Sequence, residues 1–142
     1  MTEFKLGPAY TDQGRRVAEH WSRLAVTYEG AIRALQKKGI SPDQIAVDDL
    51  HALDGGLAST DELATLASIA ADQIVLDAGS GVGGPARRIA SKFEASVWGL
   101  ELSERLIETA EKFTELVGLH GRVRFKQGSA LAIPKSGSRR QG

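Results

Sequence analysis

The first part of the chain carries the hydrophobic pattern of one long amphipathic helix. Between residues 11 and 38, apolar residues recur at alternating spacings of four and three, which places them on one helical face. They are Val17, Trp21, Leu24, Tyr28, Ala31 and Leu35. Lys37 and Lys38 suit the negative end of the helix dipole, and Gly39 predicts the helix end. We expect this apolar stripe to pack on a neighbouring domain or subunit.

A second helix is predicted from residue 59 onwards. Ser59 and Glu62 have the spacing of a capping box, in which each side chain binds a free backbone N–H of the first turn. The apolar face predicted for this helix consists of Leu63, Leu66, Ala67 and Ala70. Beyond it the hydrophobic pattern changes.

From residue 73 the pattern becomes strand, turn and helix, repeated. Short apolar runs predict strands over residues 73–77, 96–101 and 122–127, with helices over 85–93 and 104–117 between them. The first run, "QIVLD", is typical of a strand buried on both faces, whereas apolar and charged residues alternate in the third. Strands that alternate with helices predict an α/β fold with a parallel sheet and right-handed crossovers.

Composition and charge then narrow the classes of function. The 142 residues suffice for one domain, or for a small domain with an appendage. Because 18 basic and 18 acidic residues cancel, no overall field attracts nucleic acid or an anionic membrane. The lack of cysteine excludes disulfides, thiolate metal sites and cysteine catalysis, and we expect no metal site. The N-terminus has no signal-peptide pattern and no run approaches about 18 apolar residues, so we expect a cytoplasmic protein.

A glycine-rich turn between the first predicted strand and its helix is the main candidate site. Gly79, Gly81 and Gly84 fit the spacing G-x-G-x-x-G of a nucleotide-binding turn. Glycine lets a ligand approach the backbone closely and meet the N-terminus of the helix. Glu101 ends the next predicted strand, where a carboxylate can accept hydrogen bonds from both hydroxyls of a ribose. These features together predict a ligand that contains a nucleoside.

Asp77, two positions before Gly79, distinguishes between nucleotide ligands. A dinucleotide such as NAD would place its pyrophosphate close by, and a carboxylate within a few Å repels it by roughly 1–4 kcal/mol. S-adenosylmethionine has an adenosine for Glu101, an ammonium group for Asp77 and no phosphate. The pattern therefore favours S-adenosylmethionine over NAD. An alternative is that Asp77 only caps the backbone of the turn.

Three motifs resemble those of class I S-adenosylmethionine-dependent methyltransferases. "VLDAGSGVGGPARRIA" matches the first motif of that family, "VWGLELSERLIETA" its second-strand motif and "RVRFKQGSALAIP" its third. The chain is most similar to the small-molecule group that includes sarcosine/dimethylglycine and ubiquinone/menaquinone methyltransferases. The resemblance runs from about residue 51 to residue 134. It implies S-adenosylmethionine as cofactor, a Rossmann-like parallel sheet and a small-molecule methyl acceptor.

The resemblance also assigns roles to individual residues. It implies that the methionine end of the cofactor is lined by Asp77, Gly79, Ser80 and Gly81. It implies that Glu101 binds the ribose and that Leu102 packs on the adenine. Ser129 and Ala130 stand where the family usually has an Asp-Ala pair, so Ser129 would accept the hydrogen bond from the adenine amino group without a charge. No catalytic base is identified.

The chain departs from the family pattern after residue 134, where "KSGSRRQG" replaces the expected fourth strand. The motifs predict residues 1–58 as a helical lead-in, 59–134 as a partial cofactor-binding domain and 135–142 as a polar tail. We expect an N-terminal fragment with about three strands that is inactive alone. Its first strand would be an open apolar edge through which the chain self-associates. The alternative is a non-catalytic remnant or interaction module that binds S-adenosylmethionine weakly or not at all.

Overall fold

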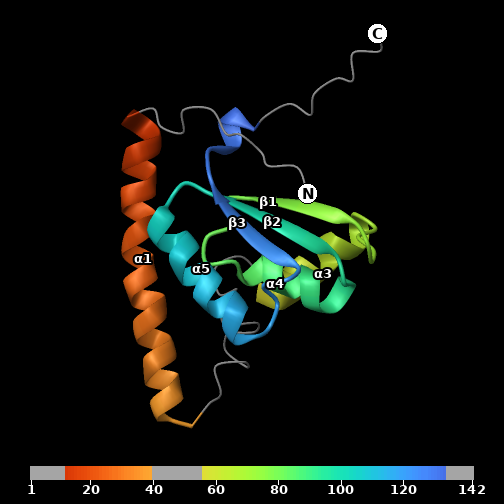
Figure 1. Cartoon of the computed structure of the whole chain (residues 1–142), viewed down its shortest axis with the longest axis horizontal. Helices are drawn as coiled ribbons and strands as arrows, with labels where there is room; N and C mark the ends of the chain where they lie inside the picture. The colour runs from red at the N-terminus through yellow and green to blue at the C-terminus, as the bar shows by residue number, and fades with distance from the viewer. Residues whose placement is uncertain (1–11, 40–55, 134–142) are drawn as a thin grey trace.

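The structure, a computed structural model, describes residues 12–39 and 56–133 and is built around a three-stranded parallel sheet in the order β1-β2-β3 (Figure 1). In chain order, the described elements are α1 (Asp12–Lys37), α3 (Gly56–Leu66), β1 (Ile74–Ala78), α4 (Gly84–Phe93), β2 (Ser96–Glu101), α5 (Glu104–Leu116), β3 (Val123–Gln127) and the 3₁₀ turn η2 (Ala130–Ala132). The predicted α/β fold, with a partial Rossmann-like sheet preceded by helices, is confirmed. The predicted tail, residues 135–142, lies outside the described residues.

The hydrophobic core lies between the sheet and helices α4 and α5. Val75, Val97 and Val123 are paired in register across the three strands, and Val97 and Val123 are buried. They pack in one cluster with Ala64, Ala86, Ile89, Ala90 and Ala95. Small residues on α4 allow the helix to approach the sheet closely, so burial of one strand face is nearly complete.

Strand β1 differs from its prediction, because it is not buried on both faces. Ile74 is 70% exposed and Leu76 is 50% exposed. Among the described strands β1 pairs only with β2, so its outer edge is open, as predicted from the motifs. An apolar strand is buried on both faces only when other elements cover both, and the described part of the chain covers one.

The second predicted helix exists, but its predicted start and its predicted apolar face are wrong. Helix α3 begins at Gly56, so Ser59 lies within the helix and does not cap it. Leu63 and Leu66 are 69% and 76% exposed, and Ala64 is the buried residue. The reason is that Asp61 on the same helix binds α4, which turns Ala64 rather than the leucines toward the core. The predicted domain boundary at residue 59 falls within α3, and the division itself stays a prediction.

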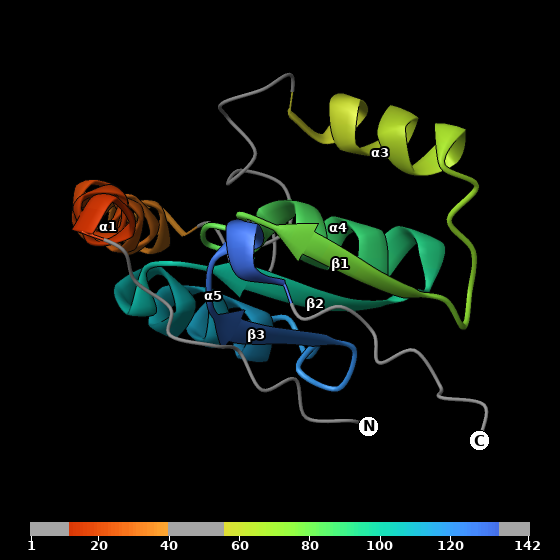
Figure 2. The ribbon, with the colours of Figure 1, turned by 90° about the horizontal axis from the view of Figure 1, so that it is seen from above.

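Helix α1 lies along α5 (Figures 1 and 2), and this contact uses the polar side of α1. Glu29 accepts hydrogen bonds from Arg105 at 3.0 Å and from Thr109 at 2.9 Å. Val17 and Trp21 from the apolar stripe are 39% and 43% exposed. The side chains of Leu24, Tyr28, Ala31 and Leu35 lie outside the described residues. The stripe residues that are described are therefore partly exposed, and packing of the stripe on another domain or subunit stays a prediction.

Helix boundaries elsewhere follow the predicted capping signals. Gly39 adopts a φ of 81° just after α1, and Ser103 caps α5 by accepting a hydrogen bond from the Leu106 N–H. None of the helices within the described ranges combines the length and the apolar character needed to cross a membrane.

Candidate functional site

The glycine turn between β1 and α4 has a backbone that only glycine adopts readily. Gly79, Gly81 and Gly83 have φ values of 78°, 56° and 81°. A Cβ atom at Gly79 or Gly81 would meet nothing within 4 Å, so these two positions are open as well as left-handed. The spacing G-x-G-x-x-G predicted Gly84 rather than Gly83 as its third glycine, and it is Gly83 that takes the left-handed conformation before α4.

The turn is anchored to the end of strand β2. The N–H groups of Gly79 and Ser80 both donate to the carbonyl of Leu100, at 2.8 Å and 3.1 Å. Within the turn, the N–H of Gly83 donates to the carbonyl of Ser80 at 2.9 Å. Backbone groups that would otherwise remain unsatisfied near the core are thus used to hold the turn in one shape.

Glu101 lies against the turn, as its place after the glycines predicted. It is buried, and its two oxygens accept hydrogen bonds from the N–H of Gly81 at 2.8 Å and of Ser103 at 3.1 Å. Each carboxylate oxygen has two acceptor positions, so one remains on each oxygen for a ligand hydroxyl. Binding of a ribose by Glu101 stays a prediction.

Asp77 and Ser80 carry polar atoms that are buried without a hydrogen-bond partner. These atoms are Oδ2 of Asp77 and Oγ of Ser80. Burial, together with the negative charge of Glu101, raises the pKa of Asp77 to about 6. Buried polar atoms without a partner are rare in folded proteins, and the turn thus has one acceptor and one hydroxyl ready for a ligand group.

The remaining predicted cofactor residues follow β2 and β3 at the carboxyl end of the sheet, where the glycine turn also lies. Leu102 is half-buried, and its carbonyl accepts a hydrogen bond from Gln127 at 3.1 Å. The hydroxyl of Ser129 accepts from the Leu131 N–H at 3.1 Å and so caps η2, which Ala130 begins. Since the strands are parallel, their carboxyl ends share one edge with the turn (Figure 1). Contacts of these residues with adenine stay predictions.

Two supports of the turn were missed by sequence reasoning because they come from distant elements. The Phe125 ring of β3 lies under the turn, so that a Cβ atom at Gly83 would come within 2.5 Å of it and one at Gly99 within 2.4 Å. Arg87 of α4 is fully buried and donates to the carbonyl of Val82 at 2.7 Å. Gly99, a glycine inside a strand, was the available sequence signal, since such a residue often marks a close approach.

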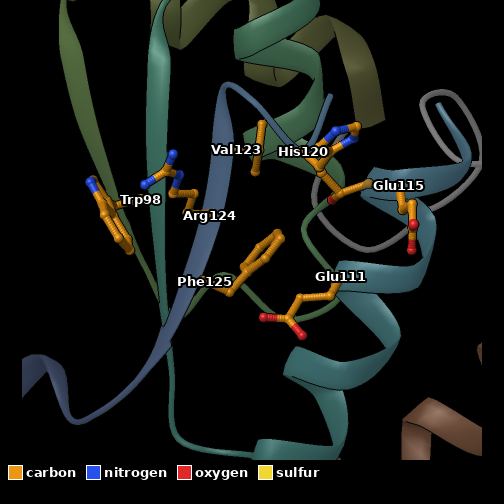
Figure 3. Close-up of a pocket in the computed structure, with 8 residues that line it drawn as sticks. Trp98, Glu111, Glu115, His120, Val123, Arg124 and Phe125 are labelled. Atoms are coloured by element: carbon orange, nitrogen blue, oxygen red, sulfur yellow. The ribbon is translucent and has the colours of Figure 1, made fainter. Parts of the chain in front are cut away.

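A pocket of about 420 Å³ lies at strand β3 and shares Phe125 with the support of the glycine turn. Its lining consists of Trp98, Glu111, Thr114, Glu115, His120, Val123, Arg124 and Phe125. Figure 3 shows Trp98 and Arg124 on one side of the β3 ribbon and Glu111, Glu115 and His120 on the other. These polar side chains therefore do not converge on one point.

Comparison with known proteins shows that this part of the chain is similar to methyltransferases. A family model described as a methyltransferase domain matches residues 75–140. The methyltransferase GfsG of Streptomyces halstedii is 34% identical over 96 residues, covering 68% of this chain and 34% of that protein. Sterol 24-C-methyltransferase erg-4 of Neurospora crassa is 41% identical over 71 residues, covering 50% of this chain and 19% of that protein.

A solved methyltransferase structure is also similar to this chain in its fold. An S-adenosylmethionine-dependent methyltransferase from Thiobacillus denitrificans, in complex with S-adenosylhomocysteine, is 26% identical with a TM-score of 0.50 over 60% of this chain and 35% of that chain. The described sheet, turn and matched motifs are thus similar to the cofactor-binding part of S-adenosylmethionine-dependent methyltransferases. The chain spans 34% and 19% of the length of the two curated relatives named above.

Proposed function

We propose that this chain supplies the S-adenosylmethionine-binding part of a methyltransferase that acts on a small-molecule acceptor. The observation that carries the proposal is the buried, unpartnered Oδ2 of Asp77 beside the left-handed glycines of the turn. An ammonium group fits an anionic acceptor there, whereas a pyrophosphate is repelled by it. The unpartnered hydroxyl of Ser80 suits the carboxylate of the same amino acid group.

The residues that would hold the cofactor fall into two groups. Asp77, Gly79, Ser80 and Gly81 would bind its amino acid end, which the open space above Gly79 and Gly81 admits. Glu101 would accept hydrogen bonds from the ribose, and Leu102, Ser129 and Ala130 would border the adenine. When bound, S-adenosylmethionine supplies a methyl group on a positively charged sulfur.

The role of the chain's own residues in such a reaction is to position and to exclude water. Methyl transfer needs the acceptor atom in line with the sulfonium, in a site with little water. The turn is held by Leu100, Glu101 and Phe125, so a ligand bound to it takes one defined position. A sterol methyltransferase among the relatives supports an acceptor that is a small molecule.

The open side of β1 supports two further proposals. Ile74 and Leu76 expose apolar surface next to unpaired backbone groups, which favours pairing with another strand. We propose that the 142-residue chain alone transfers little or no methyl group and self-associates through this edge. An interaction module that binds S-adenosylmethionine weakly is the second candidate function, favoured by the same exposed edge. A cytoplasmic location stays a prediction.

Calorimetry of the full chain with S-adenosylhomocysteine and with NAD tests the proposal. We expect binding of S-adenosylhomocysteine and none of NAD. Replacing Asp77 by Asn should weaken that binding by about tenfold or more, because a charge-assisted hydrogen bond to the ammonium group is lost. Asp72→Asn is the matched control, since it removes the same charge from an exposed position. Binding of neither ligand supports the interaction module, and binding of NAD contradicts the proposal.

A further inference from the structure

Arg87 is an arginine buried in the core, where a positive charge has an unfavourable environment. It lies on the first turn of α4 with none of its surface exposed. Burial lowers the pKa of its guanidinium to about 9, which leaves the group charged near neutral pH. A buried charge costs stability compared with an apolar residue of similar size, so its presence calls for a reason other than stability.

The contacts of Arg87 connect the glycine turn with helix α5. Its Nη1 atom donates to the carbonyl of Val82 at 2.7 Å, within the turn. The same atom lies 3.3 Å from the hydroxyl of Thr114 and 3.4 Å from the carbonyl of Ala110, both on α5. The guanidinium carbon is 5.7 Å from the centre of the Phe113 ring, within the range of a cation–π interaction.

The bond to Val82 fixes the orientation of one peptide group in the turn. The carbonyl of Val82 and the N–H of Gly83 belong to the same planar peptide unit. That N–H donates to the carbonyl of Ser80, and the backbone N–H of Arg87 donates to the carbonyl of Gly83 at 3.0 Å. The side chain and the backbone of Arg87 therefore hold the peptide groups on both sides of Gly83.

The opposite side of the turn is held by Glu101, through the N–H of Gly81. The N–H of Gly81 and the carbonyl of Val82 belong to two peptide groups separated by one peptide unit, so an acidic side chain from β2 and a basic side chain from α4 bind nearby peptide groups of the same turn. We infer that Arg87 is a positioning residue, which sets the shape of the glycine turn and thereby the affinity of the site for S-adenosylmethionine. This inference rests on the proposed function, because it concerns the same site.

Arg87→Met tests the inference, because methionine has a similar length and no donor. We expect S-adenosylhomocysteine to bind about tenfold more weakly by calorimetry, while the free energy of unfolding stays the same or rises. A purely structural role predicts the opposite result, a loss of stability with unchanged affinity in the folded fraction. Equal affinities of the wild type and the folded Met variant overturn the inference.

Arg88→Met is the matched control on the same helix. Arg88 forms two hydrogen bonds of 2.9 Å with Asp61 of α3 and does not reach the turn through them. We expect this variant to lose stability and to keep its affinity for S-adenosylhomocysteine. If Arg88→Met weakens binding as much as Arg87→Met does, the effect is not specific to the turn and the inference fails.

Two measurements keep the test decisive. If Arg87→Met does not fold, Arg87→Lys replaces it, since the lysine side chain is one bond shorter and its ammonium group stops short of the position of Nη1; we expect binding weakened about two- to fivefold, and unchanged binding overturns the inference. If the wild type does not bind S-adenosylhomocysteine, the proposed function fails, and amide hydrogen exchange still decides the positioning role. Faster exchange at Gly83 in the variant, with the β1–β2 ladder unchanged, supports it, and unchanged exchange at Gly83 contradicts it.

Discussion

Strand β1 is surrounded very differently on its two sides. At its carboxyl end, Asp77 leads into a turn that β2, β3 and α4 all contact. On the face that the described elements leave uncovered, Ile74 and Leu76 are 70% and 50% exposed. The same five-residue strand therefore carries a tightly held turn at one end and an exposed apolar face along its length. The turn is held in one conformation because several elements contact it. The exposed apolar residues of β1 remain available for contact with another strand or protein.

The largest change in the free energy of unfolding is expected from Gly83→Ala, which disturbs the packing of the glycine turn. A Cβ atom would lie 2.5 Å from the Phe125 ring and 2.9 Å from the Arg87 guanidinium, at a φ of 81°. Overpacking and backbone strain together should lower the free energy of unfolding by about 3 kcal/mol, measured by urea unfolding. Gly79→Ala is the control, with only strain of about 1 kcal/mol, because its Cβ would meet open space. Equal losses in both variants would show that the turn is not tightly supported.

Asp77→Asn should raise the free energy of unfolding, in contrast to Gly83→Ala. The pKa of Asp77 is about 6 in the folded chain against an ordinary value of 3.8, so the folded state disfavours the ionised form. This penalty is absent below the ordinary pKa, grows as the pH rises through it and is complete above about pH 6. The amide avoids it, so stability should rise by about 1–3 kcal/mol at neutral pH and change little in acid. Thermal unfolding across this pH range checks it, and a variant less stable than the wild type at neutral pH contradicts it.

The same titration should govern binding in the wild type. The ammonium group of S-adenosylhomocysteine needs the ionised form of Asp77, about a tenth of the molecules at about pH 5. Affinity should therefore rise about tenfold between about pH 5 and pH 7.5, as measured by calorimetry. Asp77→Asn should show a much flatter profile. If the affinity of the wild type does not depend on pH, Asp77 does not contact the ammonium group of the ligand.

The smallest effect on stability is expected on the open side, from Ile74→Lys. Ile74 is 70% exposed, so the free energy of unfolding of the monomer should change by less than about 0.5 kcal/mol. A lysine on an edge strand opposes pairing with another strand, so self-association should be abolished in sedimentation velocity. Leu131→Lys, at a residue 99% exposed beyond β3, is the control and should leave association intact. If Ile74→Lys still self-associates, the interface does not lie at β1.

Much of the fold was predictable because its signals are local. The alternation of strands and helices, the cap at Ser103 and the glycine after α1 each depend on neighbours in the chain. The prediction for α3 failed because the orientation of a short helix depends on its tertiary partners. Leu63 and Leu66 form a plausible apolar face in sequence, yet the contact of Asp61 with α4 turns Ala64 inward instead.

The sequence by itself determined the glycine turn, the acid before it and the acid after the next strand, since spacing along a strand–turn–helix unit fixes where these residues fall. Only the tertiary structure decided what the turn rests on and how its acid titrates. Phe125 and Arg87 reach the turn from β3 and α4, and the pKa of Asp77 rises because folding buries it beside Glu101. Burial and charge proximity depend on elements far apart in the chain, so no local pattern contains them.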